Sequence, residues 1–316
     1  MRKKNAHGGL TLAALTVALS CSGCIQGTTD PADVASLVEL TFQGLRPLGE
    51  GLKYQAWAVT RRGGVFQGVP FLVFDVSPSG ALVDPVQDTV LTGPFLVRLA
   101  TRDIEGVALS LELTQGEFTT SSYSYLLGGE VEGKIAQLEP ASWMGLDMDL
   151  AGMTGGYMLE TPTGGDGEGD LSGIWFLDRS GGTPVPGLDL PEAVAGWTYE
   201  GWVVVGTDTL STGKFSTPTG ADASNRFCGE DPAPPFPGED FLVDPPAGVS
   251  FPLNLPGAEV FVTLEPWGTW DLEPQSPVFL RLLEGEIPHS AVSGESYGLS
   301  SLFNQLPRGT ARVRKP

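Results

Sequence analysis

Short apolar runs separated by glycine and proline dominate this sequence and restrict it to a β-rich fold. The 316 residues include 43 Gly and 26 Pro, and almost no stretch keeps the apolar period of a long helix. Alternating apolar runs bounded by turn residues are typical of strands. We therefore predict an all-β protein. Its 41% of apolar residues is enough to form the core of one large or two small domains.

Two series of these runs resemble each other in order and in sequence. Three matches carry the likeness: Tyr54 and Trp57 with Tyr199 and Trp202, VALSLE (107–112) with VFVTLE (260–265), and LLGGEV (126–131) with LLEGEI (282–287). The offset drifts slowly along the chain, which is what insertions in loops between retained strands produce. We predict two tandem immunoglobulin-like or related antiparallel β-sandwich units, over 37–135 and 185–316, the second ending in a basic C-terminal tail.

The region 136–184 lies between the copies and is predicted to be a hairpin. GGYMLETPT (155–163) and SGIWFLD (172–178) read as strands that either close the first sheet or bridge the copies. Their connection carries Asp166, Glu168 and Asp170 at alternate positions, as calcium loops do, but Leu177 stands where such a loop needs a twelfth-position Glu. A solvated turn is therefore favoured over a weak calcium site.

The first 24 residues predict an export signal with a lipoprotein cleavage motif. A basic start (MRKK) precedes an apolar run of 13 residues, which is too short to span a bilayer as a helix. The run ends in LSCSGC, which resembles the motif whose cysteine becomes the lipidated N-terminus. Cys21 is favoured, Cys24 is the alternative, and ordinary secretion with cleavage near Ala18 is a third reading. Residues 25–36 then form a polar tether.

Charge limits the partners. Acidic residues outnumber basic ones by 38 to 18, giving a net charge of −20, so the body repels nucleic acid and anionic lipid headgroups. The predicted partners are the lipid bilayer, through N-terminal acyl chains, and a protein or an envelope polymer. The one basic cluster, Arg308, Arg312, Arg314 and Lys315, reads as a solubilising tail or as an electrostatic contact.

The cysteines and histidines leave little catalytic or metal-binding chemistry. If Cys21 is lipidated, Cys24 and Cys228 are free to form a disulfide; if Cys24 is lipidated, Cys228 stands alone. The mature chain keeps one histidine, His289, and has no GxSxG motif, so a Ser-His-acid triad is disfavoured. We predict no cofactor and no resident metal.

Two sets of side chains remain as candidates for chemistry. Glutamates recur at equivalent positions of the copies, Glu112 with Glu265 and Glu130 with Glu286, and this recurrence favours structure over paired-carboxylate hydrolysis. The aromatics of WTYEGWVVV (197–205) occupy both faces of one strand, which favours a buried core strand over a sugar platform.

These residues also suggest a family. Tyr199-x-x-Trp202, the Gly213-Lys214-Phe215 segment and the VFVTLEP strand (260–266) resemble the extracytoplasmic C-terminal domain of anti-sigma-K factors. The likeness covers about 185–290, and more faintly 40–135. It implies a small β-sandwich outside the cytoplasmic membrane. Sigma-factor binding in that family belongs to a separate cytoplasmic segment, which we do not find in this sequence.

Taken together, the sequence predicts a non-enzymatic, lipid-anchored binding or sensing module of the bacterial cell envelope, in the periplasm or on the outer surface. Its contacts are expected through the long loop 217–244, because a long loop inside a compact domain is usually functional or disordered. The alternative is a glycan or envelope-polymer binding module that uses Trp197, Trp267 and Trp270. A carboxylate-dependent hydrolase is the third reading.

Overall fold

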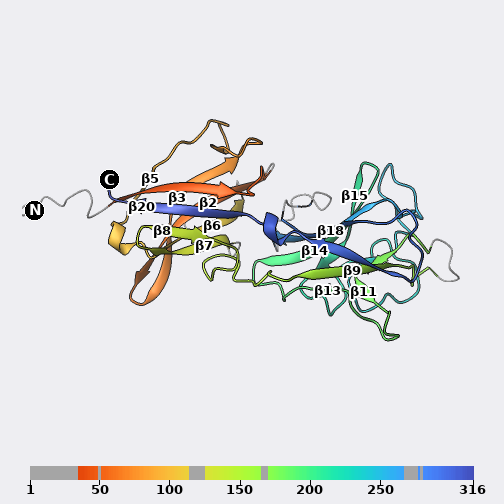
Figure 1. Cartoon of the computed structure of the whole chain (residues 1–316). Helices are drawn as coiled ribbons and strands as arrows, with labels where there is room; N and C mark the ends of the chain where they lie inside the picture. The colour runs from red at the N-terminus through yellow and green to blue at the C-terminus, as the bar shows by residue number, and fades with distance from the viewer. Residues whose placement is uncertain (1–34, 49–50, 114–124, 165–169, 267–276, 278–279) are drawn as a thin grey trace, which may run out of the picture.

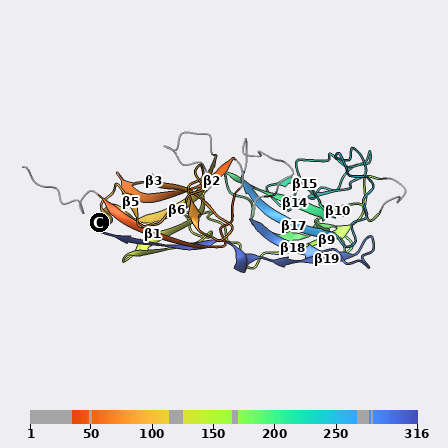
Figure 2. The same cartoon turned by 90° about the horizontal axis from the view of Figure 1, so that it is seen from above.

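The computed structural model describes residues 35–48, 51–113, 125–164, 170–266, 277 and 280–316, and in these ranges it is all-β, as predicted. Two large antiparallel sheets form a half-barrel and a nearly closed barrel. Figures 1 and 2 show them as two lobes lying end to end. One hydrophobic cluster includes buried residues of both lobes, among them Leu109 and Val262, so the cores are continuous.

The first lobe holds nine strands, in the spatial order β4-β3-β2-β6-β7-β8-β20-β1-β5. Their bounds are β1 Ser36–Gln43, β2 Leu52–Arg62, β3 Val65–Val76, β4 Leu82–Val83, β5 Phe95–Val97, β6 Gly106–Leu113, β7 Tyr125–Glu132, β8 Ile135–Leu138 and β20 Arg308–Arg314. A short 3-10 turn, η2 (Thr101–Asp103), follows β5.

The second lobe is built from β9 to β19, with the order β15-β14-β17-β18-β19-β9-β10-β16, and β13 also pairs with β9. Their bounds are β9 Thr154–Leu159, β10 Ile174–Trp175, β13 Leu188–Asp189, β14 Trp197–Val205, β15 Asp208–Phe215, β16 Gly238–Glu239, β17 Glu259–Pro266, β18 Arg281–Glu286 and β19 Ser296–Ser301. A small separate ladder joins β11 (Leu177–Asp178) and β12 (Val185–Pro186).

The predicted boundary at the C-terminus is wrong. The segment TARVR is not a tail of the second copy, because β20 inserts between β8 and β1 of the first sheet. The chain therefore leaves the first lobe after β8, builds the second, and returns past the 3-10 turn η3 (Phe303–Gln305). Without β20, the backbone groups of β1 and β8 that face it would lack their ladder partners.

The region between the copies also differs from its predicted placement. The hairpin of β9 and β10 forms, with Leu159 opposite Ile174, but it belongs to the second sheet through pairing of β9 with β19. It neither closes the first sheet nor bridges the lobes. The period-2 pattern predicted the hairpin itself, whereas its partner strand β19 is polar and was not predicted.

The two copies correspond at the level of single hydrogen bonds. In β2 a bulge precedes Trp57, and in β14 a bulge precedes Trp202. Trp57 Nε1 donates to Ser110 Oγ over 2.8 Å, and Trp202 Nε1 donates to Thr263 Oγ1 over 2.9 Å. A second pair of bulges lies just before those hydroxyl residues. Because these three details recur at matching positions, the repeat is a structural one.

Candidate functional site

The aromatic residues that the copies share are core residues, as their two-sided strand pattern predicted. Tyr54, Trp57, Tyr199 and Trp202 are each at most 1% exposed. Burial raises the pKa of both tyrosine hydroxyls above the usual range. These side chains therefore hold the fold together and present no surface to a ligand.

Trp197 is buried as well, at 3% exposure, although it borders a groove. The groove has a volume of about 480 Å³ and is also lined by Lys214 and Asp222. The indole Nε1 of Trp197 has no hydrogen-bond partner in the part of the chain that the structure describes. Trp267 and Trp270, the other two members of the predicted glycan set, lie outside the described residues. They follow Pro266, which pairs with Trp197.

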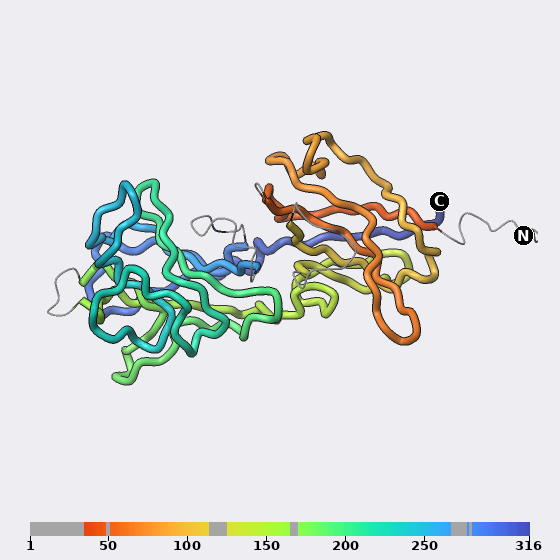
Figure 3. Tube along the Cα trace, turned by 180° about the vertical axis from the view of Figure 1, so that it is seen from behind, coloured from red at the N-terminus to blue at the C-terminus, as the bar shows by residue number. Residues whose placement is uncertain are grey.

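An exposed aromatic pair lies on the first lobe instead. Trp143 is 45% exposed and Phe66 is 36% exposed, and their ring centroids are 4.5 Å apart at an interplanar angle of 58°. Phe66 is the second residue of β3, the return strand of the long β2–β3 hairpin, which projects from the body in Figure 3. Trp143 comes from the connection that follows β8. We call Phe66 and Trp143 the aromatic platform.

Polar neighbours hold the platform in place. Trp143 Nε1 donates a hydrogen bond of 2.9 Å to Glu130 Oε1. The guanidinium of Arg61 lies over the Phe66 ring, 4.1 Å from its centroid, and forms an ion pair of 3.2 Å with Glu105. Both rings are thus held by charged neighbours, and a carboxylate has two oxygens that can each accept hydrogen bonds. The arrangement offers an apolar surface bordered by carboxylates.

Glycine explains how the connection that carries Trp143 packs so closely on the first sheet. Next to Trp143, Met144 is buried against Trp57, and a Cβ on Gly128 would lie 2.5 Å from the Met144 Cβ. Only glycine lets this connection approach the sheet so closely. The aligned residue in the second copy is Glu284, whose side chain would occupy that space. The β14–β15 hairpin is also shorter than the β2–β3 hairpin.

The platform was not predicted from the sequence. Two features of the sequence could have indicated it. Both residues lie outside the segments that match between the copies, and each is close to a turn or connection: Phe66 just after a Gly-Gly turn and Trp143 just before Met144. The exposure of a tryptophan depends on which segment packs over which strand, and a single strand pattern does not contain that information.

The predicted contact loop 217–244 is packed into the second lobe. Phe227, Phe236 and Phe241 are buried. The side chain of Asp240 is fully buried and accepts hydrogen bonds from the Thr163 backbone N–H, over 2.7 Å, and from Trp175 Nε1, over 2.6 Å. Its pKa is raised by burial, although these hydrogen bonds favour the ionised form. We interpret Asp240 as a structural link between the loop and the β9–β10 hairpin.

A second acid of the loop, Asp222, joins the two edge strands of the second sheet. Its carboxylate accepts the backbone N–H of Gly238 on β16 and that of Ser224, each over 2.8 Å. On the β15 side it lies against Gly213, where a Cβ would be 2.4 Å from Asp222 Oδ1. Burial raises the pKa of Asp222 to about 7. Asp222 therefore changes charge near neutral pH.

The other predicted site residues are placed only in part. Cys228 is 7% exposed, and burial raises the pKa of its thiol, so the unreactive neutral form dominates. Cys21 and Cys24 lie outside the described residues, and lipidation and the Cys24–Cys228 disulfide stay predictions.

Of the three carboxylates of the weak calcium candidate, Asp170 is exposed in a turn, while Asp166 and Glu168 lie outside the described residues. Among the described residues no group of three or more His, Cys, Asp or Glu side chains is placed to hold a metal ion.

The recurring glutamates differ in their surroundings. Glu112 in β6 and Glu265 in β17 are buried, and Glu112 accepts a 2.6 Å hydrogen bond from Ser110. Glu130, near the end of β7, and Glu286, the last residue of β18, are both exposed. Burial lowers the pKa of Lys53, whereas its cross-strand neighbour Glu112 favours the charged form. These contacts account for Glu112 as a structural residue of the first sheet.

No family model, no curated protein and no solved structure matches this chain. The likeness to anti-sigma-K extracytoplasmic domains therefore stays a prediction. The described residues contain no helix that is long and apolar enough to cross a membrane.

Proposed function

We propose that this protein is a non-enzymatic binding module of the bacterial cell envelope, anchored by lipid at its N-terminus, and that its ligand is a neutral or amino-sugar glycan of that envelope. The observation that carries the ligand class is the aromatic platform. A hydrogen-bonded tryptophan that stays 45% exposed leaves much of its apolar ring open to solvent. Exposed apolar surface that a protein maintains in this way is typical of binding sites.

The chemistry of the surroundings narrows the ligand. One face of a pyranose ring is lined by C–H groups and packs on an indole, while its hydroxyls hydrogen-bond to carboxylates beside the ring. Glu105 and Glu130 supply such acceptors next to Phe66 and Trp143. Both carboxylates and the net charge of −20 repel anionic polymers, so we expect uncharged sugars or amino sugars.

Lipid anchoring rests on the leader and on the LSCSGC motif. Mass spectrometry of the mature N-terminus tests it directly, and an unmodified chain that starts downstream of Cys24 contradicts it. A sigma-factor gene beside this one would support the regulatory reading instead.

Co-sedimentation of the full chain with purified peptidoglycan sacculi tests the ligand. We expect Trp143→Ala to weaken binding about tenfold or more, as truncation of a central aromatic contact does. Trp143→Phe should retain part of the affinity because it keeps an aromatic face. Val86→Ala, at a residue that is 90% exposed and outside the platform, is the control and should bind as the native chain does.

Two outcomes contradict the proposal. Equal binding by the Trp143→Ala and native chains would move the site elsewhere on the molecule. Absence of binding to sacculi and to soluble neutral oligosaccharides alike would remove glycans as the ligand class. A circular dichroism spectrum of each variant shows whether the fold is intact, and we expect it to be intact because Trp143 is half exposed.

A further inference from the structure

The start of β1 and the end of β20 lie side by side in the first sheet. Leu37 pairs with Arg314 on one side and with Leu96 of β5 on the other. The described chain begins at residue 35, so the predicted lipid-bearing segment joins the body here. The 14 residues between Cys21 and Ser36 span at most about 50 Å when fully extended. This end of the first lobe therefore stays within that distance of the bilayer when Cys21 carries the lipid.

Basic residues from three neighbouring segments gather at the same end. Arg312 and Lys315 come from the C-terminal strand and its end, Lys134 from the β7–β8 turn, and Arg98 from the residues after β5. The Lys134 carbonyl accepts the backbone N–H of Val313, which places the turn beside β20. The predicted tail is thus part of a folded surface.

The cations of this end are mostly unpaired. Arg314 forms an ion pair of 3.1 Å with Glu39, but Arg98, Lys134, Arg312 and Lys315 form no ion pair with any described residue. All four are exposed. Two acids lie beside them, because Glu39 is opposite Arg312 and Glu132 is opposite Ile135 in the ladders. The basic residues still outnumber these two acids, in a chain whose net charge is −20, so this end is more basic than the molecule as a whole.

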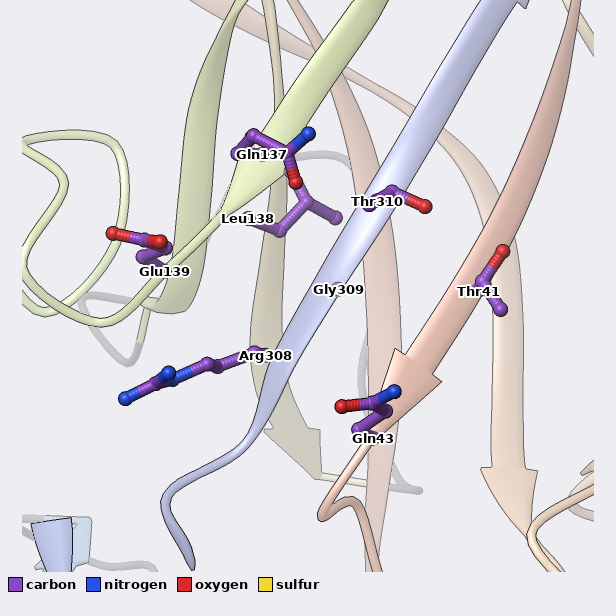
Figure 4. A pocket seen from close by; sticks show the side chains of 8 residues that line it. All are labelled: Thr41, Gln43, Gln137, Leu138, Glu139, Arg308, Gly309 and Thr310. Carbon is purple, nitrogen blue, oxygen red and sulfur yellow. The ribbon is translucent and has the colours of Figure 1, made fainter. Parts of the chain in front are cut away.

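Exposed apolar side chains accompany the cations. Leu96 is 56% exposed and Ile135 is 36% exposed, and Ile135 lies opposite Arg312 in the ladder. Figure 4 shows the continuation of this sheet face, where Arg308 and Thr310 of β20 lie between Gln137 and Thr41 and line a groove of about 290 Å³. Basic residues interleaved with exposed aliphatic ones are typical of surfaces that lie on anionic bilayers.

We propose that Leu96, Arg98, Lys134, Ile135, Arg312 and Lys315, here called the tether end, contact the anionic phospholipid surface to which the chain is anchored. This inference rests on the lipid anchoring in the proposed function. It limits the sequence-based expectation that the body repels anionic lipid headgroups to the parts of the body outside the tether end. The tether end turns toward the lipid and the acidic remainder of the body faces away. The acyl chains provide the affinity, and the tether end sets the orientation.

The electrostatics favour such an orientation at short range. The screening length at physiological ionic strength is about 8 Å, so the lipid charge acts on the nearest residues and not on the distant acidic ones. Each basic residue near an anionic surface favours the bound state by roughly a factor of five. Four unpaired cations are enough to orient a body that its tether already keeps near the membrane.

Residue footprinting of the full lipidated chain in vesicles tests the proposal. Arginines are modified with a glyoxal reagent and lysines by acetylation, and mass spectrometry measures the rates. In vesicles with about 30% phosphatidylglycerol we expect the rates at Arg98, Lys134 and Arg312 to fall about fivefold compared with phosphatidylcholine vesicles. Arg226, exposed on the second lobe, is the internal reference and should react equally in both. About 1 M salt, where the screening length is about 3 Å, should abolish the protection.

The paired variant Arg98→Glu with Arg312→Glu should lose protection at Lys134, and these exposed substitutions should leave the fold intact. Equal rates in the two kinds of vesicle, or protection that survives about 1 M salt, overturn the proposal. Protection by a soluble anionic polymer but not by vesicles would assign the surface to that polymer and also overturn it. If the chain is lipidated but its tether-end residues are not protected from modification, only the proposed lipid contact of the tether end is contradicted. If the mature chain is not lipidated, the anchoring in the proposed function is contradicted.

Discussion

The two lobes share their central strands and differ in what covers them. β2 and β14 have the same bulge, the same buried Trp and the same tyrosine hydrogen bond to a carbonyl eight residues upstream. Around them, the first lobe has the longer β2–β3 hairpin and a connection after β8 that packs on the sheet and exposes Trp143. It also contains β20, which comes from the C-terminal end of the chain. The second lobe has the packed loop 217–244. The common part is buried and holds the fold together, and the proposed binding surfaces lie in the parts that the lobes do not share.

The strongest test of the common part is to remove its tryptophans. Trp57→Ala and Trp202→Ala each delete an indole that is 1% exposed together with its hydrogen bond, so each should cost about 3–5 kcal/mol of unfolding free energy. Denaturant unfolding followed by circular dichroism measures the loss. If one substitution lowers the unfolding free energy by several kcal/mol and the other by less than about 1 kcal/mol, the two tryptophans do not have equivalent structural roles.

A smaller effect should follow from making the first lobe more like the second at Gly128. Gly128→Ala places a Cβ 2.5 Å from the Met144 Cβ, so the connection must shift, at about 1–3 kcal/mol, and Trp143 shifts with it. We expect weaker binding to sacculi as well as lower stability. Glu284→Ala, at the aligned position in the second lobe, has a half-exposed side chain and should change both properties little. If the Gly128→Ala chain binds sacculi with the native affinity, binding by the platform does not depend on how Met144 packs against Gly128.

The same comparison shows what the sequence could and could not predict. Period-2 runs located β2, β6, β14 and β17, because two-sided burial and turn residues are local signals. The position of β20 was not predictable, since an alternating strand pairs equally well with either sheet until the return path of the chain is known. The role of Gly128 was hidden for a similar reason: it depends on Met144, which meets it only through tertiary packing.

In the second lobe Asp222 lies between the edge strands β15 and β16, so the stability of this lobe should depend on pH near neutrality. The pKa of Asp222 is raised to about 7 in the folded chain, above its ordinary value. The stabilising contribution is complete below about pH 4 and is lost as the pH rises to about 7, by about 1–2 kcal/mol after allowance for partial exposure. Asp222→Asn should flatten this part of the profile. A stability difference between native and Asp222→Asn chains that stays constant from about pH 4 to 8 would contradict the assignment.

The smallest expected effect concerns the tyrosine hydroxyls, and it tests the equivalence of the copies most finely. Tyr54 donates to the Arg46 carbonyl over 3.0 Å and Tyr199 to the Pro191 carbonyl over 2.8 Å. Because each ring stays packed on its cross-strand phenylalanine, Tyr54→Phe and Tyr199→Phe should each cost about 1 kcal/mol.

The double variant should lose the sum of the two costs if the hydroxyls act independently within one cooperative unfolding transition. Two separate transitions in thermal unfolding, with each substitution lowering only one midpoint, would instead show that the lobes unfold as independent units. That result would contradict the continuity of the hydrophobic core, because a cluster that includes both Leu109 and Val262 should couple the two sheets.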